Sequence, residues 1–208
     1  MLSPSGLLLV RHGETPLNVA RVLQPADTPL SPNGLLQAAA VARRLVGMGL
    51  AGIVSSDLPR ALQTAQAIAA ATGLPIRSSA LLQERNFGAL RGLPYDTLAE
   101  DPIASEAEPP GGESGPAFRA RVDRAFAWAL ERQRELGGLL AVVSHGLVIH
   151  SMLARHTRLP DGAVLPARIA NTSLSRLAAE PPHAATLVDC SAHLRAAAAD
   201  DAHALSGG

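Results

Sequence analysis

Two histidines stand out in this sequence because each closely follows an apolar run and is followed by a glycine. One polar residue separates the run at 7–10 from His12, and one separates the run at 139–143 from His145. Short apolar runs of this kind predict buried strands, and α/β proteins bind ligands at the carboxyl ends of their parallel strands. A histidine at that place can act as a nucleophile or as an acid–base catalyst. A single such histidine is more often structural, but two in matching positions favour a shared site.

The elements that would position these histidines alternate along the chain. Residues 15–30 are predicted to be a loop, and Ser31 is predicted to cap a helix that starts at Pro32 and ends before Gly47. The other predicted strands lie at 53–55, near Ile76, at 173–177 and at 186–188, and the other predicted helices lie at 57–71, 116–136 and 146–155. Strands that alternate with amphipathic helices predict an α/β fold, a three-layer sandwich with a mainly parallel central sheet flanked by helices.

The domain organisation is predicted to be simple. Residues 1–190 are long enough for one domain with a proper core. The stretch at about 78–115 is rich in Pro and Gly, and we interpret it as a lid-like insert because compositionally similar sequence resumes after it. Residues 191–208 are rich in Ala and are predicted to form a flexible C-terminal tail.

Charge and cysteine content exclude several function classes. The 18 basic and 18 acidic residues balance, which leaves no basic face for nucleic acid and no polybasic patch for a membrane. All the basic residues are Arg, so every fixed cation is a planar guanidinium suited to oxyanions. The single Cys190 excludes an internal disulfide and disfavours a thiolate metal site. The apolar run near the N-terminus is too short for a signal core or a membrane span, so a cytoplasmic protein is expected.

The segment around His12 resembles the signature of a known family. Residues 9–15 read Leu-Val-Arg-His-Gly-Glu-Thr, with Asn18 and Gln24 following, and this is similar to the histidine phosphatase superfamily, the phosphoglycerate mutase-like group. Further stretches match in order: 29–31 with Gly34 and 37–38, 55–58 with 60–61 and 63–65, 82–85 with Gly88 and Gly92, 112–114, and 143–146. The resemblance covers residues 7–178 and is specific because so many segments agree. One departure is Pro25, where members of the family often carry Gly.

The resemblance implies catalytic roles for four residues. His12 is the implied nucleophile, which forms a phosphohistidine and must be neutral; nearby guanidinium charges favour that form. Arg11 and Arg60 are implied to clamp the phosphoryl oxygens and to stabilise the transition state. Glu84 is implied to protonate the leaving oxygen and then to activate water. Taken without the motif, Arg60 reads as a solvated helix residue and Glu84 as a surface carboxylate.

The resemblance also implies the rest of the phosphate pocket. His145 is assigned to the catalytic set as a further donor, with Gly146 beside it, and Asn18 and Gln24 resemble the family's neutral phosphate donors. No metal and no cofactor are predicted. The remaining histidines are weaker candidates, and His183, His193 and His203 are expected in solvent.

The insert bears on which reaction is expected. It lacks the Arg-Arg-Ser-Tyr-like stretch with which cofactor-dependent phosphoglycerate mutases grip the substrate carboxylate, and it is longer than the insert of protein-phosphohistidine phosphatases. We therefore expect a metal-independent phosphomonoesterase of the histidine acid phosphatase type that acts on a small phosphorylated metabolite. Arg85, Arg91 and Tyr95 of the insert either contact that metabolite or face solvent.

Two other functions stay open at this point. One is a cofactor-dependent phosphoglycerate mutase. The other is a non-catalytic phosphoester-binding module, which is disfavoured because His12, Arg60 and Glu84 are all retained. Neither nucleic acid nor membrane is an expected partner, and a homodimer stays open.

Overall fold

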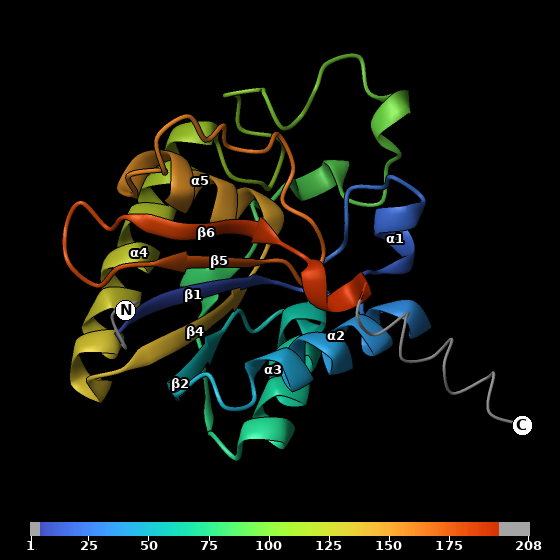
Figure 1. Cartoon of the computed structure of the whole chain (residues 1–208). Helices are drawn as coiled ribbons and strands as arrows, with labels where there is room; N and C mark the ends of the chain where they lie inside the picture. Colours follow the sequence, from blue (N-terminus) through green and yellow to red (C-terminus); the bar gives the residue numbers. More distant parts are fainter. Residues whose placement is uncertain (1–4, 196–208) are drawn as a thin grey trace, which may run out of the picture.

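The structure is a computed structural model that describes residues 5–195, and a six-stranded sheet forms its centre (Figure 1). The strand order is β3-β2-β4-β1-β5-β6. The strands are β1 (Gly6–Arg11), β2 (Leu50–Ser55), β3 (Ile76–Ser78), β4 (Leu139–Ser144), β5 (Leu174–Leu177) and β6 (Ala185–Cys190). β1, β4, β2 and β3 run parallel, whereas β5 and β6 add an antiparallel edge. The predicted mainly parallel sheet is confirmed.

Helices cover both faces of this sheet, as the alternation of elements predicts (Figure 1). Helices α2 (Pro32–Leu45) and α3 (Pro59–Thr72) pack on one face through a cluster that includes Leu8 and Val10 of β1. Helices α4 (Gly115–Leu136) and α5 (Gly146–His156) pack on the other face through a cluster that includes Leu7 and Leu9. Successive side chains of a strand point to opposite faces, so β1 supplies both cores. The predicted α/β sandwich is confirmed.

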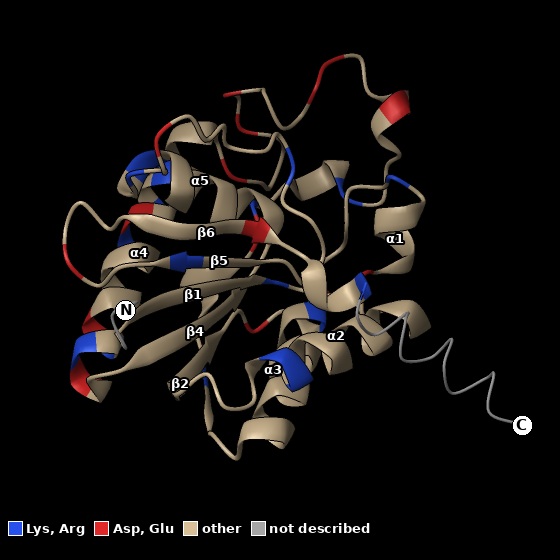
Figure 2. Cartoon of the chain, in the orientation of Figure 1, with Lys and Arg blue, Asp and Glu red and all other residues tan. Residues whose placement is uncertain are grey.

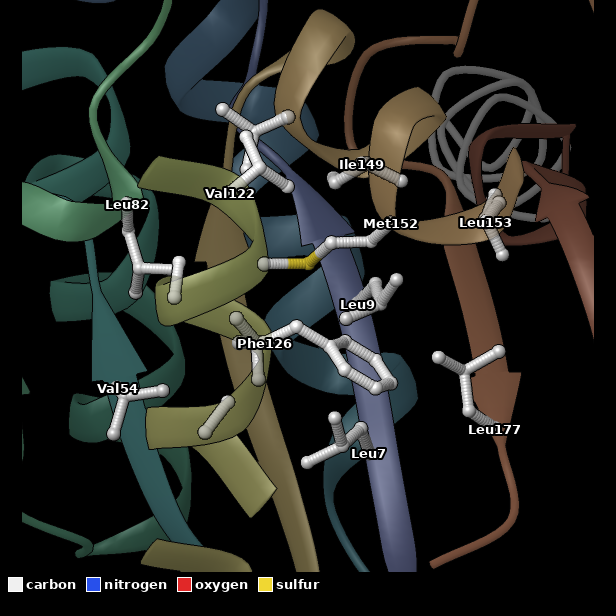
Figure 3. Close-up of a cluster of buried hydrophobic side chains, with 14 of the residues drawn as sticks. Leu7, Leu9, Val54, Leu82, Val122, Phe126, Ile149, Met152, Leu153 and Leu177 are labelled. Carbon is white, nitrogen blue, oxygen red and sulfur yellow. The ribbon is translucent and has the colours of Figure 1, made fainter. Parts of the chain in front are cut away.

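The core between the sheet and α4 and α5 is built mostly from aliphatic side chains (Figure 3). Phe126 of α4 and Met152 of α5 meet Leu9 of β1 there, and none of the three is more than 4% exposed. Each such side chain contributes about 1.5–3 kcal/mol on burial. This packing holds β1 and β4 rigidly in the centre of the sheet.

Two helix starts differ from the prediction. The predicted loop at 15–30 contains a one-turn helix, α1 (Pro16–Val19), because Thr15 and Asn18 form a capping box. Helix α3 begins at Pro59 rather than at Asp57, and its N-cap residue Leu58 makes no side-chain cap.

The insert between β3 and α4 contains three short 3₁₀ helices: η1 (Ala80–Leu82), η2 (Gly88–Leu90) and η3 (Tyr95–Thr97). Backbone hydrogen bonds tie residues 92–95 of this insert to residues 21–23 of the loop after α1: Leu23 N to Leu93 O (3.0 Å), Gly92 N to Leu23 O (2.7 Å) and Tyr95 N to Arg21 O (2.9 Å). We call residues 79–114 the lid. The lid is therefore joined to the loop that carries Gln24.

The chain after β6 is described only as far as Arg195. The prediction that His193 faces solvent was wrong, because its side chain is buried and its Nε2 lies 3.2 Å from the Thr172 hydroxyl. His203 and the rest of the predicted tail lie outside the described residues. Within 5–195, no helix has both the length and the apolar character needed to cross a membrane.

Candidate active site

The two predicted His-Gly pairs meet at the carboxyl ends of the central strands β1 and β4. Strands β1 and β4 are parallel neighbours with Arg11 opposite Ser144, so the residues after them leave the sheet side by side. The His12 N–H donates to the Ser144 carbonyl at 2.9 Å, and the ring centroids of His12 and His145 are 5.1 Å apart. The shared site predicted from matching strand ends is thus formed in the fold.

A cavity of about 520 Å³ opens at these carboxyl ends of the strands. Its walls include most of the predicted site residues, namely Arg11, His12, Asn18, Gln24, Arg60, Glu84 and Gly146. His145 is completely buried and is not one of the wall residues; its ring lies next to that of His12. The lid and the loop after α1 contribute further wall residues, including Tyr95 and Arg21.

The hydrogen bond of His12 fixes its tautomer. Nδ1 lies 2.7 Å from the Gly13 carbonyl oxygen, which can only accept, so Nδ1 carries the proton. Nε2 is then left with a free lone pair. Burial lowers the pKa of His12 well below its ordinary value, and the charges of Arg11 and Arg60 lower it further. His12 is therefore neutral near pH 7, with Nε2 able to act as a nucleophile.

Arg11 and Arg60 present guanidinium groups to the same cavity. An Nη of Arg11 donates to the Ile169 carbonyl, and an Nη of Arg60 donates to the carbonyls of Pro25 (3.3 Å) and Ala26 (3.4 Å). The Nε of each arginine is buried and has no hydrogen-bond partner among the described residues. Burial lowers the pKa of Arg60 to about 10, so it keeps its charge at neutral pH. Two oriented cations with unused donors can bind an oxyanion.

The amide groups of Asn18 and Gln24 are oriented by bonds to their oxygens. Asn18 Oδ1 accepts from the Thr15 N–H (3.2 Å) and from Asn171 Nδ2 (3.3 Å), and Gln24 Oε1 accepts from the Thr15 hydroxyl (3.0 Å). Their NH₂ groups remain as donors. Both residues line the cavity, as expected for neutral phosphate donors.

Glu84 is half-buried in the cavity wall, and both of its carboxylate oxygens accept hydrogen bonds. Oε1 accepts from the Arg85 N–H (3.0 Å), and Oε2 accepts from the Leu147 N–H (3.1 Å) in the first turn of α5. Burial raises the pKa of Glu84, although these two N–H groups and the charges of Arg60 and Arg11 act in the opposite direction. A carboxyl group with a raised pKa can hold a proton and donate it.

Arg121 of α4 was not predicted as a functional residue, yet it fixes the backbone around Glu84. Its guanidinium donates to the carbonyls of Leu81 (2.8 Å), Gln83 (2.7 Å) and Glu84 (3.3 Å), and it forms an ion pair with Glu113 (2.8 Å). No local pattern marked Arg121, because the contact joins segments about 40 residues apart. Its partner Glu113, by contrast, lies in one of the stretches that carried the family resemblance.

The three lid residues left open by the sequence have different surroundings. Arg85 neither faces solvent nor is free to bind a ligand: it is 4% exposed and donates to the carbonyls of Glu113, Pro102, Ile103 and Ala107. It therefore holds the lid together. Arg91 and Tyr95, in contrast, are half-buried in the cavity wall, and neither side chain makes a hydrogen bond to another described residue.

Two other wall residues are His150, which the sequence placed among the weaker candidates, and Arg168, which sequence reasoning missed. His150 lies one helical turn after Gly146, and that spacing was a usable signal because residues four apart share a helix face. Arg168 lies between α5 and β5, in a segment without any motif. Nothing in the sequence distinguished it from the other arginines.

Ser56 orients His145. The Ser56 hydroxyl accepts from the Leu58 N–H (3.2 Å) and lies 2.9 Å from Nε2 of His145. Burial lowers the pKa of His145 well below its ordinary value, so the ring is neutral. We infer that the Ser56 hydroxyl donates to Nε2, which places the ring proton on Nδ1. Nδ1 is buried and has no partner among the described residues, so in this tautomer His145 has an unused donor.

Replacing Ser56 by Ala is expected to lower the rate of turnover by about 3- to 10-fold, the effect of losing one hydrogen bond. The variant frees His145 to adopt the other tautomer. Binding of vanadate, which imitates the transferring phosphoryl group, should weaken by a similar factor. Ser56→Thr keeps the hydroxyl and should restore both values. Full activity of a folded Ser56→Ala variant would rule out this role.

The family of the chain follows from comparison with known proteins. The family model of the histidine phosphatase superfamily (branch 1) matches residues 7–188. The chain belongs to this superfamily. The predicted resemblance is thus confirmed, and superfamily members are phosphatases or mutases.

Individual relatives include both kinds of enzyme. A probable phosphoglycerate mutase of Yersinia pestis is 37% identical over 179 residues, which cover 81% of this chain and 82% of that protein. The structure of a mycobacterial glucosyl-3-phosphoglycerate phosphatase shows 32% identity and a TM-score of 0.70, covering 83% of this chain and 89% of the other. A candidate α-ribazole-5′-phosphate phosphatase of Escherichia coli shows 28% identity and a TM-score of 0.74, covering 89% and 95%.

Proposed function

We propose that this protein is a metal-independent phosphomonoester hydrolase that acts on a small phosphorylated metabolite through a phosphohistidine on His12. The main support for the proposal is a group of hydrogen-bond donors without partners near the free lone pair on Nε2 of His12. Within residues 5–195, Arg11 Nε, Arg60 Nε and His145 Nδ1 are buried without hydrogen-bond partners. Arg11 and Arg60 line the cavity together with His12, and the ring centroid of His145 lies 5.1 Å from that of His12. Buried donors are ordinarily paired, so a cluster of unpaired ones favours an anionic ligand.

The first step transfers the phosphoryl group to the enzyme. Nε2 of His12 attacks phosphorus in line with the ester oxygen, a P–N bond forms and the P–O bond breaks. Glu84 gives its proton to the departing alkoxide, so the alcohol leaves neutral. Arg11 and Arg60 stabilise the charge on the three phosphoryl oxygens.

The second step returns the enzyme to its starting state. Glu84, now a carboxylate, takes a proton from water, and the resulting hydroxide attacks phosphorus. The P–N bond breaks, inorganic phosphate leaves, and His12 is neutral again with its proton on Nδ1. Glu84 has regained the proton that it donated.

The alternative is a phosphoglycerate mutase, in which the phosphoryl group passes from His12 to a second hydroxyl instead of to water. It is favoured by the name of the Yersinia relative. Hydrolysis is favoured by the names of the two structural relatives and by a lid without the Arg-Arg-Ser-Tyr-like stretch. We therefore place hydrolysis first.

The test is release of phosphate from p-nitrophenyl phosphate with EDTA present. The proposed enzyme should hydrolyse this ester at the same rate with and without the chelator. Incubation with 3-phosphoglycerate should then release inorganic phosphate faster than it forms the 2-phospho isomer. Loss of activity in EDTA would contradict the metal-independent mechanism, and isomerisation without phosphate release would identify a mutase.

A further inference from the structure

We propose that Thr64 is a positioning residue for the nucleophile, because its hydroxyl ties the backbone of Gly13 to α3, the helix that carries Arg60. The inference rests on the proposed phosphoryl transfer to His12, and it adds the group that holds His12 in place relative to its phosphate clamp. Residues 63–65 form one of the stretches that carry the family resemblance, yet none of the three lines the cavity. Any part that they play in catalysis is therefore indirect.

Thr64 and Arg60 share one face of α3. They lie four residues apart, which is about one helical turn, and their exposed fractions are 0% and 2%. Figure 2 shows α2 and α3 side by side on one face of the sheet, and neither helix carries an acidic residue, drawn in red. Polar groups that are buried this deeply are ordinarily hydrogen-bonded. The hydroxyl of Thr64 finds its partners in the backbone.

The Thr64 hydroxyl makes two hydrogen bonds, each to a segment of the site. It donates to the Arg60 carbonyl at 2.8 Å and accepts from the Gly13 N–H at 3.1 Å. Because the carbonyl takes the single hydroxyl proton, a lone pair of the oxygen is left for the Gly13 N–H. One hydroxyl therefore joins the backbone of a phosphate-binding arginine to the residue that follows the nucleophile.

The peptide between His12 and Gly13 is held at both of its polar groups. Its carbonyl accepts from Asn171 Nδ2 at 3.0 Å and from the Thr172 N–H at 3.3 Å. Its N–H has no partner other than Thr64 within residues 5–195. Without that hydroxyl a buried N–H is left unpaired, which is costly, and tilting of the peptide toward another acceptor relieves the cost. Such a tilt moves the Cα from which the ring of His12 extends.

The next peptide along the chain holds the imidazole ring itself. Its carbonyl, that of Gly13, lies 2.7 Å from Nδ1 of His12. Helix α2 keeps this part of the turn in place, since a Cβ added to Gly13 would lie 2.5 Å from the Gly34 carbonyl oxygen. Helix α2 thus supports the carbonyl that selects the tautomer, whereas Thr64 on α3 fixes the peptide directly after the His12 Cα.

Threonine variants of α3 test this inference. Thr64→Val keeps the shape of the side chain without the hydroxyl, and it should lower kcat for p-nitrophenyl phosphate by about tenfold, the effect of one buried N–H left unpaired. Thr64→Ser keeps the hydroxyl and should retain most of the wild-type kcat. Thr72→Val is the matched control, because Thr72 donates to the Ile68 carbonyl at 2.8 Å, as Thr64 does to Arg60, but accepts no hydrogen bond from a described residue. It should keep the wild-type kcat.

Two further measurements separate positioning from a general loss of structure. Since the arginines keep their donors in Thr64→Val, its dissociation constant for inorganic phosphate should stay within about twofold of the wild-type value while kcat falls. The imidazole nitrogen NMR signals of His12, identified by their absence from His12→Asn, should shift in Thr64→Val. They should not shift in Thr64→Ser or in Thr72→Val.

Several results would overturn the inference while hydrolysis itself stood. One is a wild-type kcat, or unshifted His12 signals, in a folded Thr64→Val. Another is weakening of phosphate binding in parallel with kcat, and a third is an equal loss of kcat in Thr64→Ser. If Thr64→Val does not fold, Thr64→Ala compared with Thr72→Ala decides the question by the same measurements.

Failure of the proposed function gives a different result. In that case the wild-type protein does not hydrolyse p-nitrophenyl phosphate, but the His12 signals can still be recorded. A shift in Thr64→Val that is absent from Thr64→Ser would support the positioning of His12 by Thr64 in a protein that is not a hydrolase. Unshifted signals would overturn this inference as well.

Discussion

Replacing His12 with Asn is expected to lower kcat by about 10⁴-fold or more, because the nucleophile of the reaction is removed. Asn is the most informative replacement at this position because it keeps the hydrogen bond of His12 Nδ1. Its Nδ2 lies where Nδ1 of histidine lies and can still donate to the Gly13 carbonyl, which is 2.7 Å from Nδ1 in the structure. Only the nitrogen that attacks phosphorus is lost. Initial rates with p-nitrophenyl phosphate measure the effect.

Two controls separate lost chemistry from lost structure. The melting temperature of His12→Asn should stay close to that of the wild type, and the variant should still bind phosphate. His156→Asn changes a histidine that pairs with Asp123 away from the cavity, and it should keep full activity. If His12→Asn hydrolysed the ester at the wild-type rate, His12 would not be the nucleophile.

Replacing Glu84 with Gln is expected to lower kcat/KM for an alkyl phosphate by about 10²–10⁴-fold, the usual contribution of a general acid. An alkoxide is a poor leaving group and needs the proton. p-Nitrophenolate leaves without one, so kcat/KM for p-nitrophenyl phosphate should change much less. Hydrolysis of the phosphohistidine still needs Glu84 as a base. With p-nitrophenyl phosphate the variant should therefore release a stoichiometric burst of p-nitrophenol, followed by slow turnover.

The pH dependence of phosphoryl transfer from an alkyl ester follows from the shifted pKa values of His12 and Glu84. His12 must be neutral, and because its pKa is lowered it stays neutral down to acidic pH. Glu84 must be protonated, and because its pKa is raised it keeps its proton at higher pH than an ordinary Glu does. The rate with an alkyl ester should peak on the acid side of neutrality and fall as pH rises through the pKa of Glu84. In Glu84→Gln this alkaline fall should disappear, whereas any titration of the substrate remains.

The control is Glu108→Gln, which changes an exposed carboxylate of the same lid. It should keep both the rate and the shape of the pH profile. An alkaline fall that persisted unchanged in Glu84→Gln would assign the proton donor to another group.

The centre of the fold and of the site was predictable because it depends on local patterns. The apolar runs before His12 and His145 specify two strands, and parallel neighbours necessarily bring their carboxyl ends together. Arg60 and Glu84 could be assigned only through the family resemblance, since their own surroundings in the sequence read as solvent-facing. In the structure Arg60 is buried and Glu84 is half-buried, and both line the cavity.

The remaining parts depend on contacts between distant segments, which no local pattern reports. Arg121 fixes the backbone of Glu84 from a helix whose sequence shows only an amphipathic stripe. Arg85 was expected either in solvent or on the substrate, but it satisfies lid carbonyls instead. Helix α1 is only four residues long, too short for a periodic pattern. The capping box at Thr15 and Pro16 at the start of the helix were the local signals that could have revealed it.

The most direct test of the central claim is to trap the covalent intermediate. Wild-type protein is mixed with p-nitrophenyl phosphate, quenched within milliseconds in alkali, which preserves phosphohistidine, and digested for mass spectrometry. We predict one added phosphoryl group on the peptide that contains His12, absent from His12→Asn and accumulating to a higher level in Glu84→Gln. A wild-type enzyme that hydrolyses the ester while every quenched sample shows an unmodified His12 peptide, in Glu84→Gln as well, would contradict the mechanism.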